Sequence, residues 1–329
     1  MKPLIEVEEV KKYYKQTHRQ LWGKDSLIKA VNGISFSLYE GETFGLVGES
    51  GSGKTTTGQL LVQLLKQTEG KIRFKGKDVS KFSAKQLKAW RKEVQIVFQD
   101  PYSSLNPKKT VQWILHEPLA LHKLGDKSSR YKKMLQTLSD VGLDKSYLSR
   151  YPHELSGGQR QRIAIAAALI LEPQFIVIDE GVSALDVSVQ AQILNLLKDL
   201  QQQYLLTYFF ISHDLNVVQY FCDRIAVMYL GEIVELGKTA DIIKAREHPY
   251  SEALFSALPT IENSFAVMQI QGEISDASQF LEGCAFQARC PYVYELCKRE
   301  KPVVQKINDG HLVACHRIQK RKEEERVLS

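Results

Sequence analysis

Residues 48–55 have the sequence Gly48-Glu49-Ser50-Gly51-Ser52-Gly53-Lys54-Thr55, which fits the pattern G-x-x-x-x-G-K-[ST]. Glycines in such a stretch let backbone N–H groups gather around phosphate oxygens without a Cβ clash. Lys54 adds a positive charge for the phosphates, and the Thr55 hydroxyl suits Mg²⁺. The apolar run 43–47 predicts a buried strand before the stretch, and residues 56–65 predict an amphipathic helix after it, with its N-terminus facing the anion. The sequence therefore predicts a site for a nucleoside triphosphate.

A second apolar run ends in two carboxylates. Residues 175–178 are apolar and are followed directly by Asp179 and Glu180. This pattern predicts a parallel strand that is buried on both faces, with both acids at its C-terminal edge. Because neighbouring residues on a strand point to opposite faces, the two acids can take different roles. We expect Asp179 to hold Mg²⁺ through water and Glu180 to accept a proton from an attacking water molecule.

Two further polar side chains follow apolar runs. Gln99 ends the run 94–98, where it is expected to reach Mg²⁺ and the attacking water. His213 follows the run 208–211, at a strand tip from which it is expected to reach a γ-phosphate. A histidine that only caps a strand is the alternative for His213.

The motifs in chain order resemble the ATP-binding subunits of ABC transporters. The set also includes a second glycine-rich stretch that opens a helix, Leu155-Ser156-Gly157-Gly158-Gln159, and the turn Ser183–Asp186. The resemblance covers about the first 255 residues and is specific because all the motifs occur in order. It implies an α/β fold: an ABC-type P-loop ATPase core with a mixed or parallel sheet and an antiparallel β part, an inserted α-helical subdomain, and a small cysteine-containing C-terminal extension.

The resemblance also implies how the second glycine-rich stretch works. In this family Ser156 and Gly158 contact the γ-phosphate of the ATP that another protomer's loop holds, and the helix from Gln159 onward aims its positive end at the nucleotide. Two composite sites then form across a head-to-tail dimer, which ATP closes and hydrolysis opens. The family stacks an aromatic ring on adenine at the position of Tyr14; Tyr13 is the neighbouring alternative, and a buried strand aromatic is a further one.

The expected site residues fall into three groups. The nucleotide-binding residues are Tyr14, Gly48, Glu49, Ser50, Gly51, Ser52, Gly53, Lys54, Thr55, Thr56, Ser156, Gly157, Gly158, Gln159 and Asp186. The Mg²⁺ ligands are Thr55, Gln99 and Asp179, and the catalytic residues are Glu180, His213 and Gln99.

Three stretches narrow the resemblance to oligopeptide and dipeptide importers: Phe98–Pro107, Tyr151–Glu154 and His248–Tyr250. The inserted segment Gln20–Lys24 and the form Tyr102-Ser103-Ser104 favour the second, F-type ATPase subunit. The implied partners are a second ATPase subunit, expected to be of the D type and to form a heterodimer, two membrane permease subunits and an extracellular or periplasmic substrate-binding protein. Other cargo for the same ATPase role remains an alternative, namely a nickel complex, heme or an antimicrobial peptide. A soluble ABC ATPase that acts on nucleic acid or ribosomes is a second alternative.

Four of the five cysteines lie near the C-terminus: Cys284, Cys290, Cys297 and Cys315. Four thiols in a short segment without a large core of its own predict a staple, which a metal cluster, zinc or disulfides would supply. The absence of a C-x-x-C pair weighs against a zinc ribbon, and a reducing compartment disfavours disulfides. The surrounding residues resemble the extension of peptide-importer ATPases, some of which carry a [4Fe-4S] cluster. We therefore expect such a cluster here, with zinc and free or partly oxidised thiols as alternatives.

Composition and charge agree with these predictions. The chain is 43% hydrophobic and 25% charged, and no apolar run approaches the roughly 18 residues of a membrane span. The N-terminus lacks the apolar core of a signal peptide. We therefore expect a peripheral protein at the cytoplasmic face of the cell membrane, attached through its partners. The net charge of +6 is modest, and no long basic stripe interleaved with aromatic residues is present, so no nucleic-acid partner is expected.

The order of the motifs predicts two domains. Residues 1–258 are expected to form the nucleotide-binding domain, in which about 100–165 form the helical subdomain with the second glycine-rich stretch, and residues 259–329 the C-terminal extension with the four cysteines. Two positions depart from the family pattern. Gly181 stands after the predicted base, where the family has Pro or Ala, and is expected to loosen that loop. Ala167 lies in the helix that the second glycine-rich stretch opens, at a position where the family commonly has an arginine. The alanine removes a possible packing or ion-pair anchor.

Overall fold

The computed structural model describes residues 2–16, 26–181, 186–256, 282–318 and 320–321. The chain forms two compact units, and each is described by itself. The first contains Met1–Leu4, Leu38–Thr43 and Asp78–Ile211, and the second contains Ile5–Ser37, Phe44–Lys77 and Ser212–Ser329. Parts of three predictions lie outside the described residues: the whole inserted segment 20–24, residues 183–185 of the turn 183–186, and residues 259–281, 319 and 322–329 of the predicted C-terminal extension.

The core of the first unit is a parallel sheet. Its strands are β6 (Val94–Val97), β7 (Phe175–Asp179) and β8 (Thr207–Ile211), with β7 in the middle. Every residue of β7 and β8 is buried, which is the pattern of strands covered on both faces. The strand predicted before Glu180 is thus confirmed. In this register Val97 lies beside Ile178, so the residues that follow β6 and β7 meet at one edge of the sheet.

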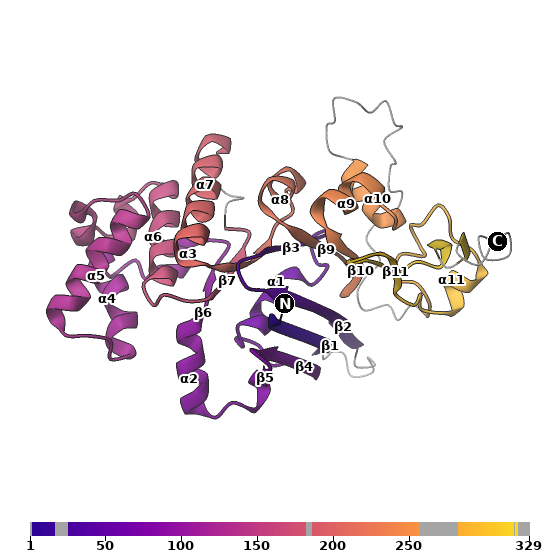
Figure 1. The fold of residues 1–329 in the computed structure, drawn as a ribbon, viewed down its shortest axis with the longest axis horizontal. Coiled ribbons are helices and arrows are strands. Elements are labelled where there is room, and N and C mark those ends of the chain that lie inside the picture. The colour runs from indigo at the N-terminus through magenta and orange to yellow at the C-terminus, as the bar shows by residue number, and fades with distance from the viewer. Residues whose placement is uncertain (1, 17–25, 182–185, 257–281, 319, 322–329) are drawn as a thin grey trace. The chain divides into compact units, whose positions relative to one another are not determined.

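Helices make up most of the rest of the first unit. They are α2 (Ala84–Glu93), α3 (Pro101–Ser104), α4 (Val111–Leu121), α5 (Lys127–Asp140), α6 (Gly157–Leu169) and α7 (Val187–Tyr204), with short 3-10 helices at Val79–Lys81, Lys145–Ser149 and Pro152–Glu154. Helices α4, α5 and α6 pack on one another (Figure 1). Each of them buries apolar side chains, among them Leu115, Leu138 and Ile163. They form the expected inserted helical part. Among the described residues, no helix combines the length and the apolar character that crossing a membrane requires.

The second unit contains the antiparallel part and the strand before the phosphate loop. Strands β1 (Pro3–Gln16), β2 (Ser26–Tyr39), β4 (Glu69–Phe74) and β5 (Lys77–Asp78) form a sheet in the order β2-β1-β4-β5 (Figure 1). Strand β3 (Thr43–Val47) pairs in parallel with β9 (Arg224–Tyr229), which continues through a hairpin into β10 (Glu232–Lys238). The hairpin turns at Leu230 and Gly231 with φ of 43° and 84°, the backbone of a two-residue turn with both central φ angles positive.

Outside its C-terminal region, the second unit has the helices α1 (Lys54–Leu61), α8 (Leu215–Phe221), α9 (Thr239–Ala245) and α10 (Pro249–Ser256). Helix α1 is shorter than the predicted helix 56–65 and begins two residues earlier. It ends because the chain turns at Gln63, whose φ of 52° is incompatible with a continued helix.

The C-terminal region, residues 282–318, belongs to the second unit and is joined to the rest of it by strand pairing. It contains α11 (Glu295–Arg299), β11 (Gln305–Asn308) and β12 (His311–Val313). Strand β12 pairs antiparallel with both β11 and β10. At this join His311 Nε2 lies 2.8 Å from Glu235 Oε1, and both side chains are almost fully buried. The Glu235 carboxylate also accepts the backbone N–H groups of Glu247 and His248, each at 3.1 Å, so its burial is fully compensated.

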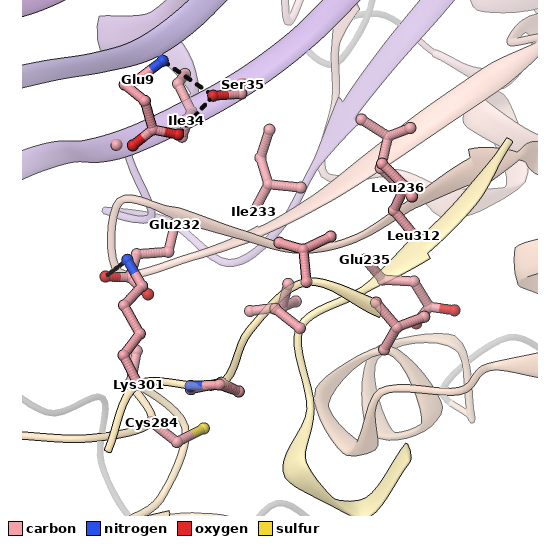
Figure 2. A pocket seen from close by; sticks show the side chains of 17 residues that line it. Glu9, Ile34, Ser35, Glu232, Ile233, Glu235, Leu236, Cys284, Lys301 and Leu312 are labelled. Carbon is pink, nitrogen blue, oxygen red and sulfur yellow. Dashed lines mark hydrogen bonds and ion pairs between the residues drawn. The ribbon is translucent and has the colours of Figure 1, made fainter. Parts of the chain in front are cut away.

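A cavity of about 110 Å³ lies between the C-terminal region and the strands of the second unit (Figure 2). Figure 2 shows Lys301 extending toward Glu232, and the Lys301 Nζ donates to Glu232 Oε1 at 2.8 Å. Leu312 lies beside Leu236, as the register of β10 and β12 requires. The C-terminal region is therefore held by backbone pairing, apolar contact and an ion pair together.

The four cysteines of the C-terminal region gather around one small space. Cys297 and Cys315 are buried, Cys284 and Cys290 are partly buried, and all four line a cavity of about 20 Å³. The spacing thus predicted correctly that the thiols meet. A space of this size accommodates about one water molecule, whereas a [4Fe-4S] cluster has eight atoms.

The predicted iron–sulfur cluster, and metal binding by these cysteines, was wrong. Among the described residues, which include all four cysteines, no group of three or more His, Cys, Asp or Glu side chains could hold a metal ion. The protonation state gives a physical reason. Burial raises the pKa of the Cys284 thiol to about 12 and also raises the pKa values of Cys290 and Cys315. Metal ligation requires thiolates, so an ion would have to displace these protons at a cost that burial increases.

Replacing Glu235 by alanine is expected to release β12 from β10. The change leaves His311 and two backbone N–H groups without their acceptor in a buried position, and we expect it to lower the free energy of opening this region by about 3 kcal/mol. Hydrogen–deuterium exchange of peptides from β10 and β12 measures this quantity. Asp309→Ala is the matched control, because Asp309 is fully exposed and its change is expected to leave the protection of β12 unaltered. Unaltered protection of β12 in Glu235→Ala would contradict the assigned role.

Alkylation by iodoacetamide is expected to report the protonated state of Cys284. With its pKa raised to about 12, its thiolate fraction at pH 8 is about a thousandfold lower than that of a thiol with the ordinary pKa of 9.0. The rate should therefore be far slower in the native chain than in the urea-unfolded chain, and should rise about tenfold per pH unit between pH 8 and 11. Mass spectrometry of the labelled peptides gives both rates. A native rate that levels off near pH 9 would show that the pKa is not raised.

Candidate nucleotide-binding and hydrolysis site

Close backbone packing fixes the shape of the phosphate loop. Gly48 follows β3 and has φ of 153°, and a Cβ atom there would lie 2.2 Å from the carbonyl oxygen of Met228 on β9. Gly53 precedes α1 with φ of 105°, and a Cβ atom there would lie 2.2 Å from the carbonyl oxygen of Ala30. Only glycine fits at either position. The neighbouring strands therefore fix the position of the backbone at both ends of the loop.

The loop presents polar groups to its own interior. The Lys54 side chain is buried, and its Nζ donates to the carbonyl oxygens of Gly48 at 2.7 Å and Glu49 at 2.8 Å. The Ser52 hydroxyl is buried and has no hydrogen-bond partner among the described residues. Thr55 is exposed in the first turn of α1, where the positive end of the helix lies. A cation, an unpaired hydroxyl and a helix N-terminus in one loop fit a triphosphate and its Mg²⁺.

The predicted loop residues differ in exposure. Ser50, Gly51 and Thr55 are exposed, Glu49, Gly53 and Thr56 are partly exposed, and Gly48, Ser52 and Lys54 are buried.

The two candidate aromatic residues of β1 differ in their environment. The Tyr13 hydroxyl donates to Asn32 Oδ1 at 2.6 Å, which holds that ring in the sheet. The Tyr14 side chain is 38% exposed, and the Lys12 ammonium lies 5.1 Å from its ring centroid. An exposed face is what a stacked base requires, so this comparison favours Tyr14.

In the first unit, two predicted residues come together at the end of β6 and β7. The Gln99 Nε2 donates to Glu180 Oε2 at 2.7 Å. This bond uses the amide nitrogen of Gln99, so its amide oxygen is the atom suited to a cation. Asp179, the last residue of β7, is only 3% exposed. The parallel register therefore places an acid, an amide and a second acid at one sheet edge, as the sequence predicts.

The backbone of Glu180 is held in an unusual conformation. Its φ is 48°, in the left-handed region that non-glycine residues rarely adopt, and its N–H donates to the carbonyl oxygen of Ile211 on β8 at 3.0 Å. Gly181 follows and is buried, and a Cβ atom there would lie 2.9 Å from Nε2 of Gln161 on α6. The glycine therefore admits the Gln161 side chain and is tightly packed, which differs from the loosening expected from the sequence. Strained backbone of this kind is concentrated at functional sites.

The second glycine-rich stretch forms the N-terminus of α6. The Ser156 hydroxyl accepts the Gln159 N–H at 3.4 Å, and the Gln159 side chain accepts the Ser156 N–H at 3.0 Å, which is a capping box. Ser156 and Gly157 are exposed. At Gly158 a Cβ atom would lie 2.6 Å from Val189 on α7, so glycine allows the two helices to approach closely. The exposed N-terminus of α6 is thus oriented by its own cap.

Asp186 and His213 lie at the starts of other elements. Asp186 caps α7: the Val189 N–H at 3.0 Å and the Ser188 hydroxyl at 2.8 Å donate to its carboxylate and lower its pKa below the ordinary value. His213 follows β8 and is exposed, one residue before Asp214, which caps α8. The structure thus gives Asp186 a local structural role, and it leaves the His213 ring accessible at a strand tip as expected.

Two contacts of the phosphate loop were missed in the sequence. The Glu49 N–H donates to the Tyr250 hydroxyl at 2.9 Å, and the Glu49 carboxylate pairs with Arg289. Both partners lie more than 200 positions away in the chain, so no local pattern indicates them. The sequence signal was limited to the His248-Pro249-Tyr250 stretch, which was used only for the family resemblance.

Comparison with known proteins gives matches along nearly the whole chain. Residues 31–183 match the family described as "ABC transporter", and residues 234–297 match "Oligopeptide/dipeptide transporter, C-terminal region". The chain is 46% identical over 318 residues to the oligopeptide transport ATP-binding protein AppF of Bacillus subtilis (strain 168), covering 95% of this chain and 97% of AppF. It is 44% identical over 318 residues to the dipeptide transport ATP-binding protein DppF of Haemophilus influenzae, covering 96% and 97%.

Solved structures agree with these matches. The protein cbiO1 from Clostridium perfringens, part of the ABC transporter complex cbiONQ, aligns with a TM-score of 0.63 and 27% identity over 74% of this chain and 92% of its own. The dimeric ATP-binding cassette MJ0796, bound to ADP and Pi, aligns with a TM-score of 0.62 and 30% identity over 71% of this chain and 98% of its own. These alignments confirm the predicted fold class. The chain belongs to the family of ATP-binding subunits of oligopeptide and dipeptide ABC transporters.

Proposed function

We propose that this chain binds and hydrolyses ATP in order to drive the import of oligopeptides or dipeptides through an ABC transporter. The observation that carries the proposal is the identity of 44–46%, over nearly the full length of both chains, to proteins named as oligopeptide and dipeptide transport ATP-binding proteins. The phosphate loop and the pair formed by Gln99 and Glu180 supply the chemistry that such a subunit needs.

ATP binding is assigned to the second unit. The backbone N–H groups of residues 48–55 and the Lys54 ammonium bind the phosphates, with the Ser52 hydroxyl as a further donor. The Tyr14 ring stacks on the base. Lys54 already lies inside the loop on two carbonyl oxygens, so little reorganisation is needed for it to reach phosphate oxygens.

Hydrolysis is assigned to the carboxylate of Glu180. It removes a proton from the attacking water. The Gln99 amide donates to this carboxylate and orients it, and the Ile211 carbonyl oxygen holds the Glu180 backbone N–H. His213 contacts the γ-phosphate. Thr55, Gln99 and Asp179 are proposed to hold Mg²⁺, which neutralises charge on the phosphates when it is bound.

The proposed assembly contains more than this chain. The ATP of another ATPase subunit contacts the N-terminus of α6 through Ser156, Gly157, Gly158 and Gln159, and the start of α7 through Asp186. In turn, the phosphate loop of this chain meets the corresponding stretch of that subunit. We propose that the other subunit is of the D type. Two membrane permease subunits and a substrate-binding protein complete the importer, and the ATPase pair lies at the cytoplasmic face of the membrane. Residues 1–258 are the ATPase domain in this proposal, and 259–329 the extension.

Glu180→Gln is expected to retain ATP binding and to lose turnover by at least about a hundredfold, because glutamine cannot accept the proton of water. ATP should then hold the ATPase pair in its closed state. Phosphate release and binding of a fluorescent ATP analogue are measured on the assembled transporter. Glu172→Gln is the matched control, since Glu172 is an exposed glutamate of the same unit whose carboxylate pairs with Lys133 at the surface. Turnover at the wild-type rate in Glu180→Gln would refute the assigned base.

Affinity purification of the tagged chain from detergent-solubilised membranes of its own host is expected to recover a second ATPase subunit and two permease subunits. Mass spectrometry identifies them, and a peptide added to the intact transporter in vesicles should stimulate ATP hydrolysis. Recovery with nickel- or heme-transport permeases would replace the proposed cargo while leaving the ATPase assignment in place. Recovery with ribosomes would reject the transport role.

A further inference from the structure

The C-terminal region reaches the phosphate loop through one arginine. Arg289 Nη1 donates to Glu49 Oε2 at 2.8 Å, and Arg289 Nη2 donates to Glu49 Oε1 at 3.1 Å. Two parallel bonds between a guanidinium and a carboxylate fix both position and orientation. The Arg289 side chain is 7% exposed and that of Glu49 is 22% exposed, so water screens this pair far less than it screens an ion pair at the surface.

Aromatic side chains hold Arg289 in place. Phe286 is 1% exposed and packs edge-on against Tyr229, with ring centroids 5.2 Å apart, and it also contacts Tyr250 at 5.4 Å. The Arg289 guanidinium lies 5.9 Å from the Tyr229 ring centroid. Tyr250 in turn accepts the Glu49 N–H through its hydroxyl. Backbone and side chain of Glu49 are therefore both anchored on this cluster.

Glu49 is the second residue of the phosphate loop, and its charge has the wrong sign for the loop's ligand. A carboxylate near a triphosphate opposes binding by charge repulsion, and the effect is strong where water is partly excluded. The carbonyl oxygen of Glu49 accepts a hydrogen bond from the Lys54 ammonium, so a displacement of Glu49 also disturbs the position of that lysine. Neutralising and fixing Glu49 would therefore serve nucleotide affinity in two ways.

We propose that Arg289 is a positioning residue of the ATP site, through which the C-terminal region sets nucleotide affinity by neutralising Glu49 and holding it in place. The inference rests on the proposed function of the loop and deepens it. The sequence motifs define no role in catalysis for the C-terminal region. In this proposal the region is a necessary part of the ATP-binding site.

Equilibrium binding of a fluorescent ATP analogue to the full chain tests the proposal. Arg289→Gln is expected to weaken binding about tenfold, because it leaves the Glu49 carboxylate uncompensated. In the double variant Glu49→Gln with Arg289→Gln the repulsive charge is gone, and binding should recover to within about threefold of Glu49→Gln alone. Arg289→Lys keeps the charge without the two parallel bonds and should lie between Arg289→Gln and the wild type.

Arg299→Gln is the matched control: it also removes an arginine of the C-terminal region, but one that is 76% exposed, and it should bind the analogue as the wild type does. On the assembled transporter, Arg289→Gln should raise KM for ATP and leave kcat close to its original value. A thermal unfolding curve for each variant checks that the chain is folded.

Two results would overturn the inference. Arg289→Gln could bind the analogue as tightly as the wild type, or the double variant could bind it as weakly as Arg289→Gln, which is the outcome of a purely structural role. Lys54→Ala separates these results from a failure of the proposed function. If the wild type binds and Lys54→Ala does not, a silent Arg289→Gln rejects the inference alone; if the wild type binds no nucleotide, the ATP site itself is rejected.

Discussion

At Gly48 the backbone passes so close to strand β9 that a Cβ atom would lie 2.2 Å from the Met228 carbonyl oxygen, and at Gly53 it passes equally close to the carbonyl oxygen of Ala30. The shape of the phosphate loop, and with it the ATP site, depends on these two close contacts. The contact at Gly48 is set by the parallel register that pairs Val47 with Val227. The contact at Gly53 is set by the start of α1 directly after this glycine. Between these fixed ends the loop has one shape, in which Lys54 bonds to two of its own carbonyl oxygens.

The contact at Glu49 adds a third fixed point, and it comes from the far end of the chain. Strand β12 brings the C-terminal region to β10, and the buried pair of Glu235 and His311 closes that join. Phe286 and Arg289 can then reach the loop from a segment that has little core of its own. The sequence suggests that this region is a separate extension, but strand pairing places it in direct contact with the phosphate loop.

Much of this was predictable because the decisive patterns are local. Strand β3 and strand β7 coincide with apolar runs that end in the loop and in Asp179, and the hairpin between β9 and β10 turns at Gly231, which adopts a positive φ without strain. Contacts such as that of Glu49 with Arg289 join residues 240 positions apart, and no periodicity indicates them. The cysteines show a different limit. Their spacing predicted that the thiols gather, but spacing says nothing about the burial that keeps the Cys284 thiol protonated.

The two acids after β7 show how packing supplies what a motif cannot. The motif Asp179-Glu180 indicates which residue is the base, but the orientation of the Glu180 side chain depends on a backbone φ of 48° at that residue. This strained φ would relax if neighbouring groups did not hold the backbone. The support comes from the Ile211 carbonyl oxygen on one side, which accepts the Glu180 N–H, and from Gln161, which fills the space beside Gly181. A larger residue at position 181 would compete with Gln161 for that space. The glycine that departs from the family pattern is therefore tightly packed, since a buried side chain from α6 occupies the volume that a methyl group would take.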